Sequence, residues 1–273
     1  MLSPVPKPDA ADLASLSLFE RFGFRLAWFV NRRLKLLASL YQRYVLGPIF
    51  RLLIDRLLQI RGLEHPMALP AGSPFLLVSN HRTFFDFFVL STVLYQRGGV
   101  ARRIYFPVRA NFFYQTLPGL VLNAAIGAFA LFPPIFRERR KLGFNRFAID
   151  EAAHLLSTKA AMVGVHPEGT RNKGADPYAL LPAQPGVGRI AMRARVPVIP
   201  AFVLGMSNDL LAIFRRNWTG GSPIHVIFGP PIDLEDLYAQ GDHPPIHAKI
   251  ANRMRDRIAL LGEAERQWAA DIE

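Results

Sequence analysis

The sequence contains no cysteine among its 273 residues. This absence excludes disulfide bonds, thiolate nucleophiles and zinc-thiolate sites, and it leaves a reducing, cytosolic environment as the simplest expectation. A secretory signal is also missing, because the first residues, MLSPVPKPDAADLAS, are polar, proline-bearing and acidic rather than basic and then apolar. We therefore expect residues 1–16 to form a loose tail.

Acidic residues are few compared with basic ones: 21 Asp and Glu stand against 33 Lys and Arg, a formal net charge of +12. Such a surface attracts an anion, whether nucleic acid, anionic lipid or an acidic small molecule, and charge alone does not choose among them. No known nucleic-acid recognition motif is present, and many basic residues lie in apolar helical stretches, so we expect no nucleic-acid partner. The length and the 51% hydrophobic content predict one large domain with a sizeable core.

Residues 17–61 lack any uncharged window of the roughly 20 residues that span a bilayer. They mix Phe, Leu, Trp and Tyr with nine basic and two acidic residues. Ser17 and Glu20 form a capping box and Gly47-Pro48 interrupts the pattern, which predicts two amphipathic helices. We expect these helices to lie in the membrane interface, with arginines on anionic headgroups. The alternative is that they pack on the core and that their arginine stems cover apolar surface.

A second segment, residues 117–136, carries no charge and is about as long as a membrane-spanning helix. Pro133-Pro134 would break such a helix near its end, and Gly119 and Gly127 weaken it. We therefore expect a short buried helix followed by a core strand at 127–132.

Beyond Gly62 the pattern changes to short apolar runs that alternate with helical ones. The expected strands are 74–80, 102–108, 127–132, 161–167, 196–203 and 223–229, and the expected helices are 84–97, 145–158, 186–195 and 247–273. This alternation predicts an α/β domain over residues 62–273, with a mixed central sheet flanked by helices. In such folds ligands bind beyond the ends of the strands.

The stretch LLVSNHRTFFDFF, residues 76–88, places polar groups at the end of an apolar run and inside a phenylalanine cluster. A strand that ends at Ser79 or Asn80 would put His81 at the sheet edge, with Asp86 one helical turn beyond. A histidine held by a carboxylate has a fixed tautomer and a stabilised imidazolium, as a general base for a hydroxyl requires. Taken alone, such a pair is more often a structural hydrogen bond.

A second polar stretch, VHPEGTRNKG, residues 165–174, follows another expected strand. Gly169 permits close backbone approach, Thr170 offers a hydroxyl, and Arg171 offers a guanidinium that grips phosphate bidentately. The alternative is a glycine-centred turn in which Glu168 and Arg171 form a surface ion pair.

Four segments in order, NHRTFFD, the basic residues after a central strand, HPEGTR and VPVIPAF, resemble the four motifs of the glycerophospholipid acyltransferase family. The best-known members of that family are 1-acylglycerol-3-phosphate acyltransferases. The resemblance covers about residues 62–231 and implies a glycerolipid-acyltransferase-like fold. It also implies that His81 is the general base that deprotonates the acceptor's glycerol hydroxyl as that oxygen attacks an acyl thioester, and that Asp86 orients it.

The resemblance also implies a set of substrate-binding residues. They are Asn80, Thr83, Arg109, Arg137, Glu168, Gly169, Thr170 and Arg171. The second motif is the weakest match, and Arg139, Arg140 or Lys141 are the alternatives to Arg137 as its phosphate contact. His166 replaces a frequently apolar residue, and we expect it to be a bystander.

These implications define the expected reaction and its location. The donor is acyl-CoA or acyl carrier protein, the acceptor is a lysophospholipid, foremost 1-acylglycerol-3-phosphate, and neither an acyl-enzyme nor a cofactor is needed. We expect peripheral or monotopic attachment to the cytoplasmic face of a membrane, with its phospholipid surface as a partner. The alternatives are another lysophospholipid, an acylated amino-acid lipid as acceptor, or a non-catalytic basic membrane-binding protein. The absence of Gly-x-Ser-x-Gly disfavours a serine hydrolase, and the scattered remaining histidines disfavour a metal site.

Overall fold

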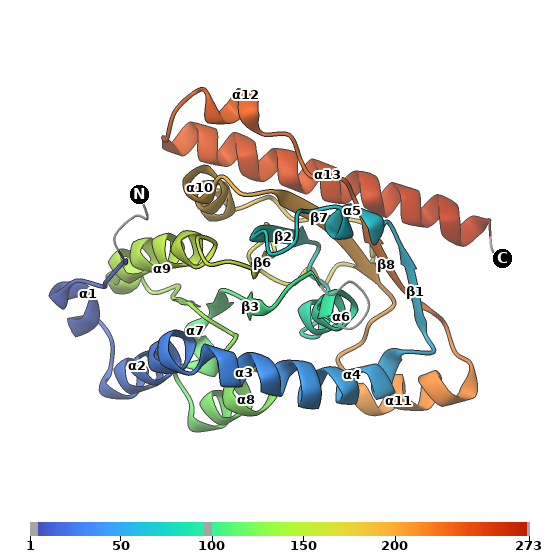
Figure 1. Ribbon diagram of the computed structural model, residues 1–273, viewed down its shortest axis with the longest axis horizontal. Coiled ribbons are helices and arrows are strands. Elements are labelled where there is room, and N and C mark those ends of the chain that lie inside the picture. Colours follow the sequence, from blue (N-terminus) through green and yellow to red (C-terminus); the bar gives the residue numbers. More distant parts are fainter. Residues whose placement is uncertain (1–4, 96–99, 272–273) are drawn as a thin grey trace.

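A six-stranded sheet forms the centre of the molecule (Figure 1). The structure, a computed structural model, describes residues 5–95 and 100–271. In spatial order the strands are β1 (Leu58–Arg61), β8 (Ile224–Phe228), β7 (Val198–Leu204), β2 (Phe75–Ser79), β6 (Ala161–Val165) and β3 (Arg103–Tyr105). Neighbouring strands run parallel except β7 and β8, which are antiparallel. The expected α/β fold with a mixed central sheet is thereby confirmed.

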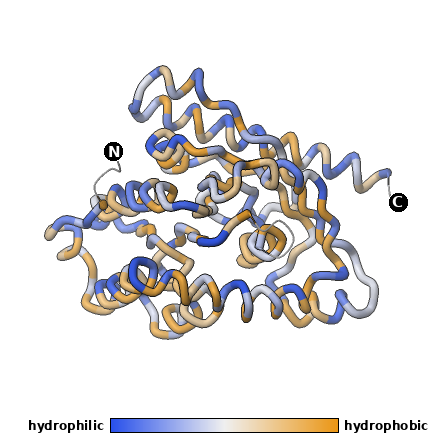
Figure 2. The backbone as a smooth tube through the Cα atoms, in the orientation of Figure 1, coloured by the Kyte–Doolittle hydropathy of each residue, from blue (hydrophilic) through white to orange (hydrophobic). Residues whose placement is uncertain are grey.

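Strand β2 lies between β7 and β6, with Leu77 opposite Ile199 on one side and Gly164 on the other. All five of its residues are buried, as expected for a strand covered on both faces. The hydropathy of the chain follows this arrangement, since the central strands are among its most hydrophobic parts (Figure 2). The residues that follow Ser79 therefore emerge at the middle of the sheet edge, where open α/β sheets bind ligands.

Helices cover both faces of this sheet (Figure 1). On one side lie α10 (Pro185–Ala194) and α13 (Pro244–Ala270), which packs on β7; on the other lie α6 (Asp86–Val93), α3 (Lys35–Tyr41) and α4 (Gly47–Ile54). Helix α9 (Leu142–Leu155) packs against α10. The helices expected at 84–97, 145–158, 186–195 and 247–273 correspond to α6, α9, α10 and α13, although residues 96–97 and 272–273 lie outside the described residues.

The remaining elements connect these layers. They are α1 (Ala10–Ala14), α2 (Leu18–Arg33), a π-helical turn (Gln42–Leu46), α5 (Glu64–Met67), β4 (Val108–Arg109), α7 (Ala110–Phe113), α8 (Leu117–Gly127), β5 (Pro134–Ile135), a 3-10 turn (Arg139–Lys141), α11 (Leu210–Thr219) and α12 (Glu235–Tyr238). Strands β4 and β5 form a separate parallel pair.

The capping box predicted at Ser17 is present and begins α2. Ser17 Oγ accepts from the Glu20 N–H at 3.2 Å, and Glu20 Oε2 accepts from the Ser17 N–H at 2.7 Å. The prediction of two helices divided at Gly47-Pro48 is wrong. The division falls at Leu34, and the π-helical turn leads directly into α4. Pro48 is tolerated because it sits in the first turn of α4, where a backbone N–H is not needed.

The expected boundaries in the N-terminal region also differ from the structure. Residues 58–61, assigned to the helical segment, form β1 and pair with β8, so the sheet begins before Gly62. Within the expected tail, Asp9 caps the short helix α1, and Leu16 is buried. Residues 1–4 lie outside the described residues.

The strand expected at 127–132 is absent from the structure. Helix α8 extends through Gly127, and Ala128 and Phe129 then adopt left-handed conformations with φ of 44° and 60°. These angles turn the chain sharply and are incompatible with an extended strand. Helix α8 is present as expected, but only one side of it is buried: Leu120 and Asn123 face the interior, whereas Leu117 and Val121 are exposed.

Candidate active site

Asn80 fixes the end of β2 to the neighbouring strand β7. Its side-chain Nδ2 donates to the carbonyl of Val203 and its Oδ1 accepts from the N–H of the same residue, both at 2.8 Å. The Asn80 side chain is buried and both its polar atoms are engaged. The side chain therefore braces β2 against β7 just before His81, and the expected contact of Asn80 with substrate stays a prediction.

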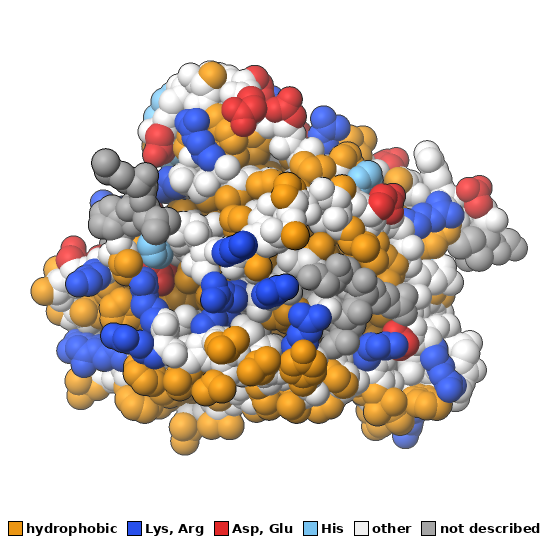
Figure 3. All heavy atoms as spheres, in the orientation of Figure 1, with side chains coloured by type: hydrophobic (Ala, Val, Ile, Leu, Met, Phe, Trp, Pro, Cys, Tyr) orange, Lys and Arg blue, Asp and Glu red, His pale blue; other side chains and the backbone are white. Residues whose placement is uncertain are grey.

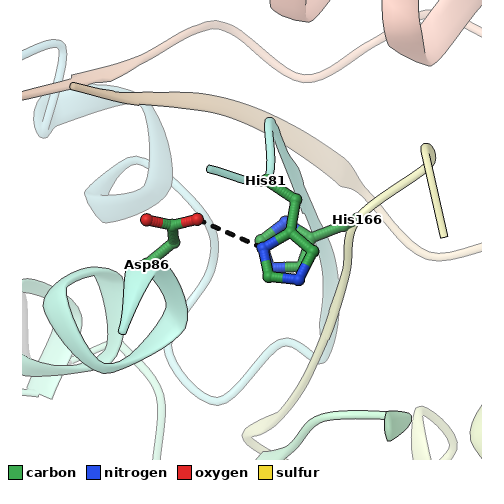
Figure 4. Close-up of side chains that lie close together, drawn as sticks. All are labelled: His81, Asp86 and His166. Carbon is green, nitrogen blue, oxygen red and sulfur yellow. Dashed lines mark hydrogen bonds and ion pairs between the residues drawn. The ribbon is translucent and has the colours of Figure 1, made fainter. Parts of the chain in front are cut away.

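His81 lies against Asp86, the first residue of α6, with Nδ1 and Oδ2 3.2 Å apart (Figure 4). Oδ2 of Asp86 also accepts from the backbone N–H groups of Arg82 and Thr83, both at 2.8 Å, and Oδ1 accepts from Thr83 Oγ1 at 2.5 Å. These donors hold the carboxylate in one orientation. An Nδ1–H that donates to Asp86 leaves Nε2 of His81 as the basic atom.

His166 stacks face to face on His81, with ring centroids 3.7 Å apart and an interplanar angle of 5° (Figure 4). Phe87 packs on its other face at 3.8 Å, and the backbone carbonyl of Ser79 lies 3.1 Å from Nδ1 of His166. We expected His166 to be a bystander, but it is buried and its ring packs directly against the ring of the candidate base, His81. The sequence signal was the histidine in place of an apolar residue before Pro167.

The side chains of His81, Asp86 and His166 offer possible metal ligands, since one atom from each lies within 4.8 Å of the others. Imidazole binds a metal through a nitrogen lone pair in the plane of its ring, and two parallel stacked rings do not direct these lone pairs to one point. The Asp86 oxygens already accept from N–H and O–H donors. The arrangement suits the transfer of a proton better than the binding of a cation.

Burial dominates the electrostatics of the pair. Desolvation, followed by the positive charges of Arg171 and Arg109, lowers the pKa of His81 to about 3. Burial likewise lowers the pKa of His166 and raises that of Asp86, although the hydrogen bonds from Thr83 and Arg82 oppose the latter shift. His81 is thus neutral and free to accept a proton.

Glu168 connects the two expected motifs through its carboxylate. Oε1 accepts from the backbone N–H of His81 at 2.9 Å, and Oε2 accepts from that of Leu181 at 2.8 Å. The Glu168 side chain is buried, and burial raises its pKa. Because both oxygens are occupied, this geometry favours a role in positioning His81 over the expected direct contact with an acceptor.

Three arginines gather beside His81. Arg109, at the end of β4, donates Nε and Nη2 to the carbonyl of Gly169 at 3.0 and 2.7 Å. Burial lowers the pKa of Arg109, and the charges of Arg137 and Arg171 lower it further, so both of these guanidiniums lie near that of Arg109. Gly169 adopts a left-handed φ of 62°, which favours glycine. Thr170 is partly exposed beside them, and Arg137 and Arg171 are exposed.

Lys141, one alternative to Arg137, is not available to bind phosphate. Its ammonium donates to Glu20 Oε1 at 2.6 Å and to Glu138 Oε1 at 2.7 Å, and the side chain is 1% exposed. Arg140 also pairs with Glu138, at 3.0 Å. The structure therefore leaves Arg137 and Arg139 as the open candidates in this segment.

A narrow, mostly apolar cavity lies along α6; about 40 Å³ of it admits the centre of a water-sized sphere, within about 430 Å³ of atom-free space that includes open solvent. Phe88, Ser91 and Thr92 of this helix line it, together with Tyr95 just beyond the helix end. The lining residues are Gln42, Leu46, Gly47, Phe50, Phe88, Ser91, Thr92, Tyr95, Ile104, Phe106, Ile126, Gly127, Ala130 and Leu131. At the far end, Gln42 donates to the Gly127 carbonyl at 2.6 Å. Phe88 from the phenylalanine cluster and four residues of the apolar segment 117–136 thus line the same cavity.

The N-terminal helices expose an apolar surface that α8 and α11 extend. The exposed side chains are Leu18, Phe22, Phe29, Leu36, Leu37, Leu40, Tyr44, Ile49, Leu52, Leu117, Val121, Leu211, Phe214 and Trp218. In Figure 3 hydrophobic side chains follow the edge formed by these elements, and Lys and Arg side chains gather next to it. Among the described residues, no helix combines the length and the hydropathy required to span a membrane.

Comparisons with known proteins found similar sequences and structures. A sequence profile described as Acyltransferase matches residues 59–204. The 1-acyl-sn-glycerol-3-phosphate acyltransferase alpha of Mus musculus is 28% identical over 197 residues, which cover 72% of this chain and 61% of that protein. The corresponding Escherichia coli (strain K12) enzyme is 29% identical over 126 residues, 45% of this chain and 48% of that protein.

The chain thus spans about three fifths of the mouse relative. Among solved structures, the 1-acyl-sn-glycerophosphate (LPA) acyltransferase PlsC from Thermotoga maritima aligns with a TM-score of 0.46 and 15% identity, over 87% of this chain and 94% of that one. The profile match includes His81, Asp86 and residues 168–171.

Proposed function

Because the chain belongs to the acyltransferase family, we propose that it transfers a fatty acyl group from an acyl thioester to the free hydroxyl of 1-acylglycerol-3-phosphate, with phosphatidic acid as the product. The observation that carries the proposal is His81, held by Asp86 and close to an arginine cluster. The acceptor is chosen because its phosphate matches the arginines and because the curated relatives carry that activity in their names.

In the proposed reaction Nε2 of His81 removes the proton from the acceptor hydroxyl as its oxygen attacks the thioester carbonyl. A C–O bond forms, the C–S bond breaks, and the proton passes from His81 to the departing thiolate. Asp86 accepts the Nδ1–H bond throughout and stabilises the imidazolium while it exists. The reaction needs no cysteine nucleophile, because the acyl group passes directly to the acceptor and no acyl-enzyme forms.

The arginines supply the second part of the proposal. Arg171 lies near the candidate base and Arg137 lies near Arg109; both are exposed, and Arg109 is anchored on the Gly169 carbonyl. A guanidinium binds phosphate through two parallel hydrogen bonds, so a cluster of this kind favours an acceptor with a phosphate. Thr170 is placed to add a hydroxyl contact.

The donor's tail and the membrane complete the layout. Phe88, two residues after Asp86, lines the apolar cavity along α6, and we propose this cavity as the place of the donor's acyl chain. The apolar and basic surface of α2, α3 and α4 would hold the enzyme peripherally or monotopically on the cytoplasmic face of a membrane, where the acceptor resides. Acyl-CoA and acyl carrier protein are both donors with the required thioester.

The test is acyl transfer by purified protein from labelled acyl-CoA, and separately from acyl carrier protein. The acceptors are 1-acylglycerol-3-phosphate, its dephosphorylated counterpart, a second lysophospholipid and an acylated amino-acid lipid. We expect transfer that requires the acceptor phosphate and falls at least about 100-fold in His81→Ala. Transfer only to acceptors without that phosphate would replace the proposed acceptor. No transfer from either donor would favour a non-catalytic membrane-binding role.

A further inference from the structure

The segment from Arg171 to Gln184 has no regular secondary structure, yet it is tied to the candidate base at two points. The backbone N–H of Asn172 donates to the carbonyl of His81 at 2.8 Å. The N–H of Leu181 donates to the same Glu168 carboxylate that holds the His81 N–H. The position of this loop, residues 171–184, therefore helps to fix the His81 backbone, together with the Asn80 brace on β7.

A third tie joins the middle of the loop to the residue after His81. The Arg82 guanidinium donates to the carbonyls of Gly174 at 2.8 Å and Asp176 at 3.2 Å. Residues 173–176 are exposed, so these bonds face water and add little stability by themselves. The loop needs an additional anchor to the body of the protein if it is to hold His81 firmly.

That anchor is Tyr178. Its hydroxyl donates to Oε2 of Glu265 at 2.7 Å, and its ring is parallel to that of Phe202 in β7, with centroids 6.0 Å apart. Glu265 belongs to the C-terminal helix α13, is 1% exposed, and contacts Nδ1 of His225 in β8 through its other oxygen. One oxygen of the Glu265 carboxylate is thus held by strand β8, and the other accepts the hydrogen bond from the loop.

We infer that Tyr178 and Glu265 are positioning residues for acyl transfer: their hydrogen bond holds the loop 171–184, and with it the Glu168 carboxylate, in the arrangement that aims His81 at the acceptor. The inference rests on the proposed function, but the anchoring itself is measurable without it. It gives the C-terminal helix, far from His81 in the sequence and outside the matched profile, a part in the reaction.

The test compares Tyr178→Phe with Tyr238→Phe in the full chain. Tyr178→Phe removes one hydroxyl donor and keeps the ring. Tyr238→Phe is the matched control, because the buried Tyr238 hydroxyl has no hydrogen-bond partner among the residues that the structure describes. We expect kcat to fall about tenfold in Tyr178→Phe and less than twofold in the control, with the KM for the acyl donor unchanged in both.

Glu265 is tested by two further variants. Glu265→Gln keeps an oxygen that accepts from Tyr178, whereas Glu265→Ala leaves the hydroxyl without its partner, so Gln should retain several-fold more kcat than Ala. Hydrogen exchange followed by mass spectrometry supplies a readout that does not depend on activity. Peptides that contain His81, Asn172 and Leu181 should exchange faster in Tyr178→Phe than in wild type or Tyr238→Phe.

The outcomes separate this inference from the proposed function. Unchanged exchange in those peptides would overturn the inference, as would a lowered melting temperature with unchanged kcat per folded enzyme. If wild type transfers no acyl group to any acceptor, the proposed function fails, and the exchange comparison alone decides whether Tyr178 and Glu265 anchor the loop.

Discussion

His81 and His166 lie ring against ring, 3.7 Å apart and within 5° of parallel. Two positively charged rings would repel each other at this distance in a buried site, so at most one ring can carry an added proton at a time. Burial lowers the pKa of both, which agrees with this requirement. The stack therefore couples the protonation state of His81 to the packing of the buried His166 ring.

This coupling predicts how stability depends on pH. The folded-state pKa of both rings lies below the ordinary value of 6.5, so the unfolded chain binds protons first as the pH falls. The stability contributed by the neutral rings is present above about pH 6.5 and is lost progressively below it. Each ring contributes a slope of at most about 1.4 kcal/mol per pH unit.

His166→Phe should keep a stacked aromatic ring and remove the contribution of His166 to the pH dependence of the unfolding free energy. Between pH 6.5 and 5, thermal unfolding should then show a shallower loss of stability than in wild type. His243→Gln, a change at an exposed histidine, is the control and should leave the slope unchanged. Equal slopes in wild type and His166→Phe would contradict the neutral stack.

The pH dependence of catalysis should lack the acid limb that histidine enzymes commonly show near pH 6.5. His81 acts as a base in its neutral form, and its pKa of about 3 keeps it neutral at every pH from 5 to 8. The kcat/KM for the acceptor should therefore show no decline with a midpoint near 6.5 over that range. The measurement is a pH profile at saturating donor, compared with the titration of the acceptor phosphate alone, whose second pKa is about 6. A limb centred near 6.5 that the phosphate does not account for would refute the burial argument.

Asp86→Asn should lower kcat about 100-fold with little change in the donor KM. The carboxylate accepts from His81 Nδ1, from two backbone N–H groups and from Thr83 Oγ1, and an amide cannot accept all four bonds. Without the carboxylate, the proton of His81 would no longer be held on Nδ1, and the orientation of the ring would no longer be fixed. Steady-state rates with a melting curve test this, and full activity in a stable Asp86→Asn protein would remove Asp86 from the mechanism.

Lys141 should prove structural rather than a phosphate ligand. Lys141→Met leaves the buried Glu20 carboxylate without its main partner, which should destabilise the fold by roughly 3–5 kcal/mol. Adding Glu20→Gln should recover part of that loss. The preference for a phosphorylated acceptor should persist in the double variant and weaken in Arg137→Gln. Loss of the preference in the double variant, with a stable fold, would restore Lys141 as a phosphate contact.

The cavity along α6 should set the acyl chain length. A Cβ at Gly127, at the far end, meets Asn123 Oδ1 at 3.4 Å and Leu131 at 3.5 Å, so a side chain fits with small adjustments. Gly127→Leu should shorten the preferred acyl chain by several carbons, seen as a lower ratio of C18 to C12 acyl-CoA kcat/KM. Gly186→Leu, at the start of α10 and away from this cavity, is the control. An unchanged ratio in Gly127→Leu would place the acyl chain elsewhere.

Several features were accessible from the sequence because they are local. His81 and Asp86 are five residues apart, so a strand followed by a helix is enough to bring them together, and the Ser17–Glu20 capping box closes within one turn. Apolar runs long enough to be buried predicted most strands of the sheet. Local patterns failed where a single turn decided the path, as at Ala128 and Phe129, or where a strand as short as β1 was defined by its partner β8.

By itself the sequence determined the class of fold, the order of the motifs and the pair at the end of β2, because backbone periodicity and short-range contacts are encoded in neighbouring residues. Only the tertiary structure decided that Glu168 holds the His81 backbone, that His166 lies beneath its ring, and that Lys141 is buried against Glu20. Those partners are 85 to 121 residues apart. Their contacts arise from how the strands and helices pack, and no pattern in neighbouring residues records that packing.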